Sequence, residues 1–266
     1  AEWYASARRV VELIDAFDQT DADCGGDAPA IARGVSDDAQ VHLANLRLTD
    51  ANGRVVIDQA DMKFAPGDRI WLTGDAGTGK TSLLRAIAGI WQWGSGGVLL
   101  PRGARVAFCA ASPFLPTGTL KDAVLYMTPP EARSDAKVMS ALQALDLGSF
   151  ASRLDEKGRW DQALSASERQ RLGLAQVLCS LPEVVIIEGG LSAFDHPTQV
   201  KLHDVLARQL PKSVILSVGG APDLADRHSR HIELVRGGNE AAVLVERGAS
   251  PQRANSETVV AGETHG

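Results

Sequence analysis

The chain has 266 residues, of which 44% are hydrophobic and 23% are charged, a composition that suits one large globular domain with short flanking segments. Its net charge of −6 excludes the basic surface expected of a protein that binds nucleic acid. No stretch approaches the roughly 20 apolar residues that a membrane-spanning helix needs, and no N-terminal signal segment is recognisable. Because the first residue is Ala1 and not Met, we expect a part of a longer protein.

The three cysteines, Cys24, Cys109 and Cys179, are widely spaced and form no CxxC pair. Two of them lie in apolar runs, so we expect reduced thiols in the protein core. This use of cysteine suits an intracellular compartment.

The two ends of the chain differ in pattern from its centre. Residues 1–17 carry apolar side chains at spacings of three and four, which predicts an amphipathic helix. Residues 18–38 are rich in Asp, Ala and Gly and are expected to form a linker. We therefore expect a helix and linker over residues 1–40, one folded domain over 41–248, and a flexible tail over 249–266.

The centre of the chain alternates between strand and helix patterns. Asn52-Gly53 predicts a hairpin turn, and Pro66-Gly67-Asp68 predicts a turn before an apolar strand. The further expected elements are strands at 70–73, 105–109, 184–187 and 213–218, helices from Lys80 and from about 197 to 209, and a helical subdomain at about 119–180. Such alternation predicts an α/β fold with a mainly parallel sheet and helices on both faces. The hairpin adds an antiparallel β subdomain near the N-terminus.

A phosphate-binding motif lies directly after the strand at 70–73. It matches GxxxxGK[ST] and consists of Gly74, Asp75, Ala76, Gly77, Thr78, Gly79, Lys80 and Thr81. Glycines let successive backbone N–H groups face the phosphates, and the helix start adds the positive end of its dipole. Lys80 is expected to reach the outer phosphates and Thr81 a Mg²⁺ ion. The motif predicts a P-loop NTPase fold but does not separate its kinase-like, GTPase-like and ATPase classes.

A second motif, Leu164-Ser165-Ala166-Ser167-Glu168, lies about 85 residues after the P-loop and about 20 before VVIIEGGLSAFD. It resembles the signature of ABC transporter ATP-binding domains, which is LSGGQ or, in one branch, LSxGE. The segments LLRAIAGIW, SPFLPTGTLKDAVLY and SVGGAPDLADRHSRHIEL are similar to the branch of half-transporters that includes peroxisomal fatty-acyl transporters and bacterial SbmA-like peptide importers. The resemblance covers about residues 1–236.

The resemblance implies that ATP binds between two such domains arranged head to tail, with Ser165 of one domain facing the P-loop of the other. It also implies a membrane-spanning permease domain, in the same native chain or in a separate one. The domain would then lie at the cytoplasmic face of a membrane. The N-terminal helix resembles the end of the last membrane-spanning helix, and an amphipathic helix packed on the domain is an equal alternative.

The residues that the family uses for hydrolysis are altered in this chain. The family's Asp-Glu pair corresponds to Glu188, which we expect at the Mg²⁺ site, and to Gly189. The positions of the family's Gln and His hold Ala111 and Gly220, and Ser167 replaces a glycine of the signature. Each loss removes water activation or stabilisation of transition-state charge, which typically costs about 100-fold in rate.

We therefore interpret the chain as a domain that binds MgATP to drive transport, with weak or absent hydrolysis and no catalytic residue of its own. A non-catalytic module that uses ATP for regulation or dimerisation is the alternative. A soluble ABC protein of repair or translation is disfavoured, because the chain has neither a second ABC cassette nor an inserted coiled coil.

Overall fold

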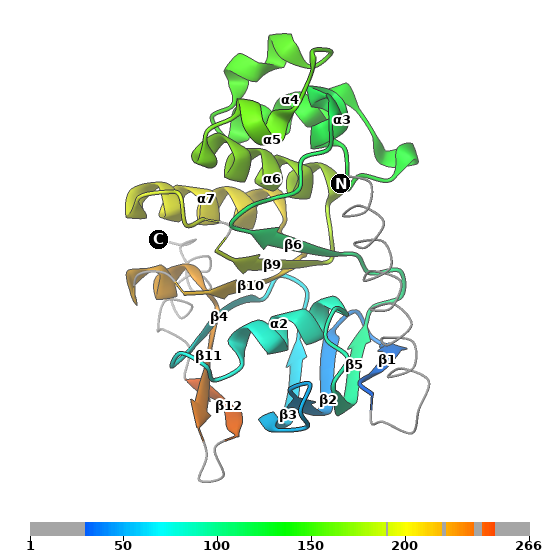
Figure 1. Ribbon diagram of the computed structural model, residues 1–266, viewed down its shortest axis with the longest axis vertical. Helices are drawn as coiled ribbons and strands as arrows, with labels where there is room; N and C mark the ends of the chain where they lie inside the picture. The colour runs from blue at the N-terminus through cyan, green and yellow to red at the C-terminus, as the bar shows by residue number, and fades with distance from the viewer. Residues whose placement is uncertain (1–29, 190, 220–221, 237–240, 248–266) are drawn as a thin grey trace, which may run out of the picture.

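A computed structural model describes residues 30–189, 191–219, 222–236 and 241–247, and a ten-stranded sheet runs through the molecule (Figure 1). The strand order in the sheet is β1-β5-β2-β3-β12-β11-β4-β10-β9-β6. These strands are β1 (Ala32–Val35), β2 (Val41–Thr49), β3 (Val55–Phe64), β4 (Arg69–Gly74), β5 (Gly94–Leu100), β6 (Val106–Ala110), β9 (Val184–Glu188), β10 (Val214–Val218), β11 (Arg230–Arg236) and β12 (Ala242–Arg247).

The strands β11, β4, β10, β9 and β6 form the parallel half of the sheet. The first four residues of β9 are fully buried, as expected of a strand that is covered by helices on both faces. The α/β fold with a mainly parallel sheet, predicted from the alternation of strands and helices, is confirmed. The carboxyl ends of these strands meet at one edge, and the P-loop begins there at the end of β4.

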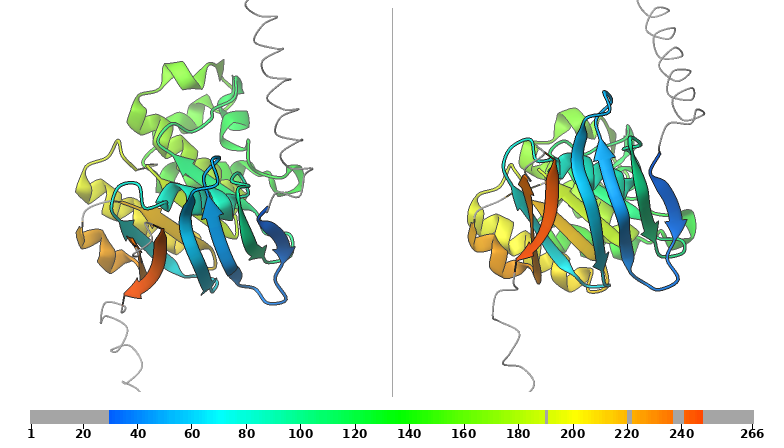
Figure 2. Two further views of the ribbon diagram at one scale, coloured as in Figure 1. Left: turned by 60° about the horizontal axis from the view of Figure 1, so that its bottom comes forward. Right: turned by 90° about the horizontal axis from the view of Figure 1, so that it is seen from below.

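The strands β2, β3 and β5 form an antiparallel half, as predicted from the hairpin signal. The hairpin turns at Asn52-Gly53, where Gly53 has a φ of 79° and the side chain of Asp50 accepts hydrogen bonds from the N–H groups of Asn52 and Arg54. Figure 2 shows these strands beside β12, which pairs with β3 and joins the two halves.

Strand β1 lies in the stretch that the sequence predicts as a linker, so the sheet begins before the expected domain start at residue 41. It pairs in parallel with β5, which lies more than sixty residues later in the chain. In this pairing Ala32 lies opposite Gly97 and Val35 lies opposite Leu100. All four β1 residues are exposed, so they carry none of the apolar alternation by which strands are recognised. The N-terminal helix predicted over 1–17 and the tail over 249–266 lie outside the described residues.

Helix α2 (Lys80–Ala88) lies against the concave face of the curved sheet (Figure 1). The parallel strands are on one side of the helix and the antiparallel strands are on the other. Its buried residues are Leu83, Leu84, Ala86 and Ile87, which form one helical face. The opposite face of the parallel strands is covered by α6 (Ala166–Ser180) and α7 (His196–Gln209). The two hydrophobic clusters on the two faces make this a three-layered domain.

The segment between β6 and β9 forms the helical subdomain expected at about 119–180 (Figure 1). Its elements are α3 (Leu120–Val124), η1 (Pro130–Ala132), α4 (Asp135–Ala144), η2 (Gly148–Arg153), α5 (Trp160–Ala163) and α6, with a small sheet of β7 (Gly118–Thr119) and β8 (Lys157–Gly158). Trp160 is 1% exposed and its indole N–H donates to the Gly118 carbonyl. No helix in the described part of the chain is long and apolar enough to span a bilayer.

Cys109 and Cys179 are free and buried, which confirms the expectation of reduced core thiols for these two residues. Burial raises the pKa of Cys109 to about 12 and that of Cys179 to about 11, so both remain protonated and unreactive at neutral pH. Cys24 lies outside the described residues.

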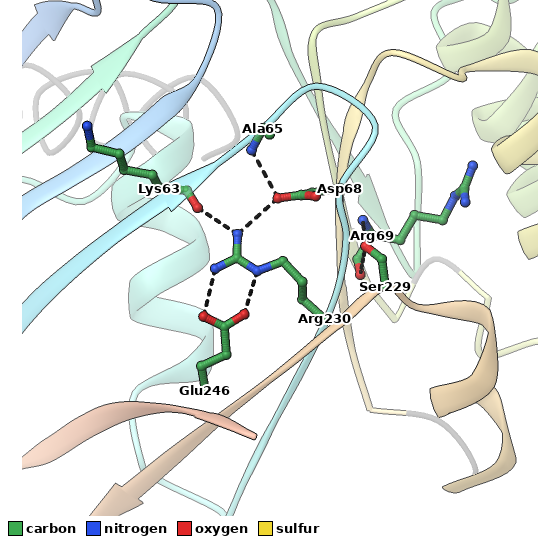
Figure 3. A network of polar contacts seen from close by, with 7 residues as sticks. All are labelled: Lys63, Ala65, Asp68, Arg69, Ser229, Arg230 and Glu246. Carbon is green, nitrogen blue, oxygen red and sulfur yellow. Dashed lines mark hydrogen bonds and ion pairs between the residues drawn. The ribbon is translucent and has the colours of Figure 1, made fainter. Parts of the chain in front are cut away.

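Arg230 ties three segments of the sheet together at the start of β11 (Figure 3). Its guanidinium donates to both carboxylate oxygens of Glu246 at 2.6 and 2.9 Å, to Asp68 at 2.9 Å and to the Lys63 carbonyl at 2.6 Å. The hydrogen bond to Glu246 raises the pKa of Arg230 and lowers that of Glu246. The network therefore fixes the β3–β4 turn against the β11–β12 hairpin.

A pair of buried histidines makes the fold sensitive to acid. His203 of α7 lies 5.1 Å from His228 between ring centroids, and burial lowers the pKa of His203 to about 4. An unfolded histidine titrates near pH 6.5, so the unfolded chain binds the proton more tightly and stability is lost as the pH falls from about 6.5 towards 4. We expect His203 alone to lower the free energy of unfolding by about 2 kcal/mol between pH 7 and pH 5.

Urea unfolding at pH 7 and pH 5 tests this expectation. In a His203→Leu variant the loss on acidification should shrink by about 2 kcal/mol relative to wild type. An equal loss in both proteins would show that other groups cause the acid sensitivity.

Candidate nucleotide-binding site

The loop between β4 and α2 has the backbone shape of a phosphate cradle. Gly74, Gly77 and Gly79 have φ values of 137°, 78° and 95°, which side-chain-bearing residues rarely adopt. A Cβ atom on Gly74 would lie 2.6 Å from the Leu234 carbonyl oxygen, and one on Gly79 would lie 2.6 Å from a methyl group of Val56. Gly79 caps α2 without a side-chain hydrogen bond, so no N-cap side chain covers the first N–H groups of the helix.

Lys80 folds back over this loop. Its ammonium group donates to the carbonyl oxygens of Gly74 at 2.6 Å and Asp75 at 2.7 Å. Thr78, which is 2% exposed, donates to the same Asp75 carbonyl at 2.9 Å and braces the turn. The positive charge is thus held against two carbonyl oxygens at the start of the loop.

Thr81 and Glu188 lie in contact although 107 positions separate them. The hydroxyl of Thr81, in the first turn of α2, donates to the carboxylate of Glu188 at the end of β9. Hydroxyl and carboxylate oxygens suit Mg²⁺, which commonly takes one or two protein ligands and completes its shell with water and phosphate oxygens. The pair therefore fits the metal site that the sequence predicts. Within the described residues, no cluster of three or more His, Cys, Asp or Glu side chains could hold a metal by itself.

The positions without hydrolytic side chains lie next to this pair. Gly189 follows Glu188 with a φ of 69°, and Ala110 forms an isolated β-bridge with it. A Cβ atom on Gly189 would lie 3.3 Å from the Cβ atom of Ala111, so the two altered positions face each other closely. Gly220, the third altered position, lies outside the described residues.

Neither nearby histidine supplies a group to the P-loop through the contacts it makes. His228 is 8% exposed, and its Nδ1 lies 2.8 Å from the Leu224 carbonyl oxygen. The Nε2 atom of His231 lies 2.6 Å from the hydroxyl of Thr73. By these contacts both histidines are structural residues of the fold.

Gln170, which the sequence analysis did not single out, joins the altered positions. Its side-chain NH₂ group contacts the carbonyl oxygens of Ala111 at 2.9 Å and Gly189 at 3.3 Å and the hydroxyl of Ser192 at 3.1 Å. Its carbonyl oxygen accepts from the N–H of Ala193 at 3.0 Å. The side chain is 4% exposed. In the sequence, only the position of Gln170 two residues after the signature indicates that its side chain connects these loops.

A basic residue also reaches the outside of the P-loop. Arg236, at the end of β11, donates to the Gly77 carbonyl at 3.4 Å. The sequence does not reveal this contact, because it depends on the pairing of β11 with β4.

Ser165 begins α6 and belongs to a capping box. Its hydroxyl accepts from the N–H of Glu168 at 3.3 Å and donates to the Glu168 carboxylate at 2.7 Å, which in turn accepts from the N–H of Ser165. These bonds lower the pKa of Glu168. The hydroxyl of Ser167, at the position of the altered signature glycine, lies 3.3 Å from that of Ser165. The signature thus presents two hydroxyl groups at one helix start.

The mainly parallel sheet and the strand–glycine loop–helix unit at 74–81 define the class of P-loop NTPases. The family described as ABC transporter matches residues 57–189, and the chain belongs to this family. The family resemblance inferred from the signature is therefore confirmed.

Two relatives and one solved structure illustrate the relationship. An uncharacterised ABC transporter ATP-binding protein of Haemophilus influenzae is 32% identical over 195 residues, which cover 73% of this chain and 33% of the relative. The lysosomal cobalamin transporter ABCD4 of Mus musculus is 31% identical over 207 residues, with 72% and 34% covered. A bacterial Atm1-family ABC exporter with ATP bound has the same fold, with a TM-score of 0.68, 20% identity, and 84% of this chain and 40% of the exporter covered. The chain spans about a third of the length of these two relatives.

Proposed function

We propose that this chain is the nucleotide-binding domain of a membrane transporter and binds MgATP at residues 74–81. The observation that carries the proposal is the P-loop, whose three glycines adopt positive φ angles and whose Lys80 ammonium group contacts two carbonyl oxygens of the loop. In this role Lys80 neutralises the outer phosphates. Thr81 and Glu188 would hold the Mg²⁺ ion, directly or through its water shell. The ion, when bound, neutralises phosphate charge.

We further propose that a second ABC ATPase domain completes the site in a head-to-tail dimer. In that dimer Ser165 would face the P-loop of the other domain, and ATP would join the two. A membrane-spanning permease domain, in the same native chain or separate, would be moved by this closure. The domain would then lie at the cytoplasmic face of the membrane. The membership in the ABC transporter family and the coverage of only about a third of the two relatives support a further domain of this kind.

Hydrolysis in this domain is proposed to be weak or absent. Ala111 and Gly189 provide no side chain that could orient or deprotonate the attacking water next to the Thr81–Glu188 pair, and Gly220 has none by sequence. Because general-base and charge-stabilising groups each contribute about 100-fold or more, their joint absence leaves phosphate binding as the principal property of the site.

A second candidate function is a non-catalytic module in which ATP serves regulation or dimerisation. The retained cradle together with the missing hydrolytic groups favours it. The two functions differ in whether ATP binding moves a permease.

Removal of the Glu188 carboxylate tests the proposed metal site. In wild type, Mg²⁺ should strengthen the binding of a fluorescent ATP analogue relative to the same titration in EDTA. We expect Glu188→Ala to reduce this Mg²⁺-dependent gain by about tenfold, because it removes a charged group that acts on the ion or its water shell.

Glu131→Ala is the matched control, because it removes an exposed carboxylate of η1 that lies outside residues 74–81 and outside the Thr81–Glu188 pair. Binding that is equal with and without Mg²⁺ in wild type would contradict the proposed MgATP site.

A further inference from the structure

Strand β1 is attached to the P-loop helix by a single long side chain. Arg33, in the middle of β1, extends to the carboxyl end of α2 and donates to the carbonyl oxygens of Ala86 at 2.7 Å and Ile87 at 3.1 Å. These oxygens belong to the last turn of α2, where the helix dipole concentrates partial negative charge. Burial lowers the pKa of Arg33, so the charge is partly desolvated where it meets the helix end.

The contact depends on a glycine. Gly89 ends α2 with a φ of 84°, and a Cβ atom at this position would lie 2.2 Å from a guanidinium nitrogen of Arg33. The N–H of Gly89 donates to the same Ala86 carbonyl that accepts from Arg33. The helix end and the guanidinium are therefore fitted to each other, and a side chain at position 89 would displace the arginine.

Helix α2 is short, and its two ends have different partners. Its first residues, Lys80 and Thr81, belong to the proposed MgATP site, whereas its last turn is held by Arg33. A nine-residue helix with a buried apolar face moves largely as one body. A displacement of its carboxyl end therefore changes the position of the N–H groups at its start.

Strand β1 is the element through which this displacement would arrive. Within the described residues it lies at the edge of the sheet with β5 as its single neighbour in the strand order, and its residues are exposed. Just before β1, the N–H of Ile31 donates to the Gln92 carbonyl at 3.4 Å. Just after β1, the N–H of Ser36 donates to the Leu100 carbonyl at 2.8 Å. With so little apolar burial, β1 can shift at a lower cost than the central strands.

We propose that Arg33 is a positioning residue that couples β1, and hence the chain that leads into β1, to the phosphate-binding end of α2. This inference rests on the proposed MgATP site and adds a contact that reaches α2 from the edge of the sheet. Nucleotide binding at the P-loop restrains β1 through Arg33, and movement of β1 changes nucleotide affinity by the same coupling.

Amide hydrogen exchange followed by mass spectrometry tests the coupling in both directions. In the nucleotide-free protein, Arg33→Ala should raise the exchange rate of the α2 amides at residues 84–88 by about tenfold. In wild type, MgATP should slow exchange in β1, and Arg33→Ala should abolish this protection. The affinity of Arg33→Ala for MgATP should fall about three- to tenfold.

Three further variants separate positioning from a general loss of stability. Arg33→Lys keeps a cation at the helix end and should restore most of the β1 protection. Gly89→Ala should reproduce the Arg33→Ala exchange pattern, because it displaces the guanidinium. Arg47→Ala, which removes another arginine of the antiparallel half that is paired with Asp58 at 3.4 Å, should leave the exchange of α2 and β1 unchanged.

The outcomes distinguish this inference from the proposed function. If wild type binds MgATP and β1 shows no protection, or the same protection in Arg33→Ala, the coupling is refuted and the MgATP site stands. If wild type does not bind MgATP, the proposed function fails. In that case the amide exchange of α2 in the nucleotide-free protein still tests the role of Arg33. Equal α2 exchange rates in Arg33→Ala and Arg47→Ala would refute this role.

Discussion

Replacing Lys80 with alanine is expected to weaken MgATP binding by up to about 100-fold. The ammonium group lies 2.6 and 2.7 Å from two carbonyl oxygens of the P-loop, so its charge is already in position before a phosphate arrives. A hydrogen bond to a charged group contributes up to about 3 kcal/mol, and about 1.4 kcal/mol corresponds to a factor of ten in affinity. Without Lys80, the N–H groups of the loop alone would face the phosphate charge.

Titration with a fluorescent ATP analogue measures this effect, and thermal unfolding checks that the variant is folded. Lys137→Ala is the matched control, because it removes an exposed ammonium group of α4 that lies outside the P-loop. This group donates a hydrogen bond to the Ala132 carbonyl at 3.2 Å. We expect this control to bind like wild type. Equal weak binding by wild type and Lys80→Ala would show that the P-loop no longer works as a nucleotide site.

The sequence predicts those parts of the site that lie within one local segment. The P-loop is contiguous, and its glycines, its preceding strand and its following helix all appear within the same stretch of chain. Glu188, 107 positions from Thr81, is assigned to the Mg²⁺ site only through the family resemblance, which does not specify the direct contact between the two side chains. Local backbone chemistry is thus sufficient for the P-loop, but not for Glu188.

The remaining features depend on contacts between distant segments. Arg33 meets α2 because the exposed strand β1 pairs with β5, and Arg236 reaches Gly77 because β11 pairs with β4. Gln170 contacts two loops that are brought together only by the parallel sheet. No periodicity or spacing in the sequence specifies these pairings, since each depends on strand register.

Gly189 illustrates a further limit. By resemblance to the family its identity indicates that a hydrolytic side chain is missing, and its φ of 69° and the nearby Ala111 show that the backbone has a shape suited to glycine. The loss of the side chain is therefore accompanied by a conformation that disfavours its return.

Gly189→Glu is accordingly expected to leave the protein nearly without ATP hydrolysis. We expect wild type to release phosphate at least about 100-fold more slowly than the 1 to 100 per second typical of phosphoryl-transfer enzymes. The glutamate would need a left-handed backbone, which costs about 1–2 kcal/mol in a residue with a side chain. Its Cβ atom would also lie 3.3 Å from that of Ala111. We therefore expect a gain in turnover of less than about tenfold.

Gly103→Glu is the matched control for stability, because Gly103 has a similar φ of 72° and no atom within 4 Å of an added Cβ. Both variants force a side-chain-bearing residue into a left-handed backbone conformation, but only Gly189→Glu also crowds a neighbouring side chain. Its free energy of unfolding should therefore fall further than that of Gly103→Glu.

A triple variant with Ala111→Gln, Gly189→Glu and Gly220→His should hydrolyse ATP faster than Gly189→Glu alone, because these groups act together on one water molecule and one phosphate. Turnover in wild type within the typical range, measured as phosphate release and abolished by Lys80→Ala, would instead mean that another group activates the water. The proposal of weak hydrolysis would then be wrong, while the proposal of MgATP binding would remain.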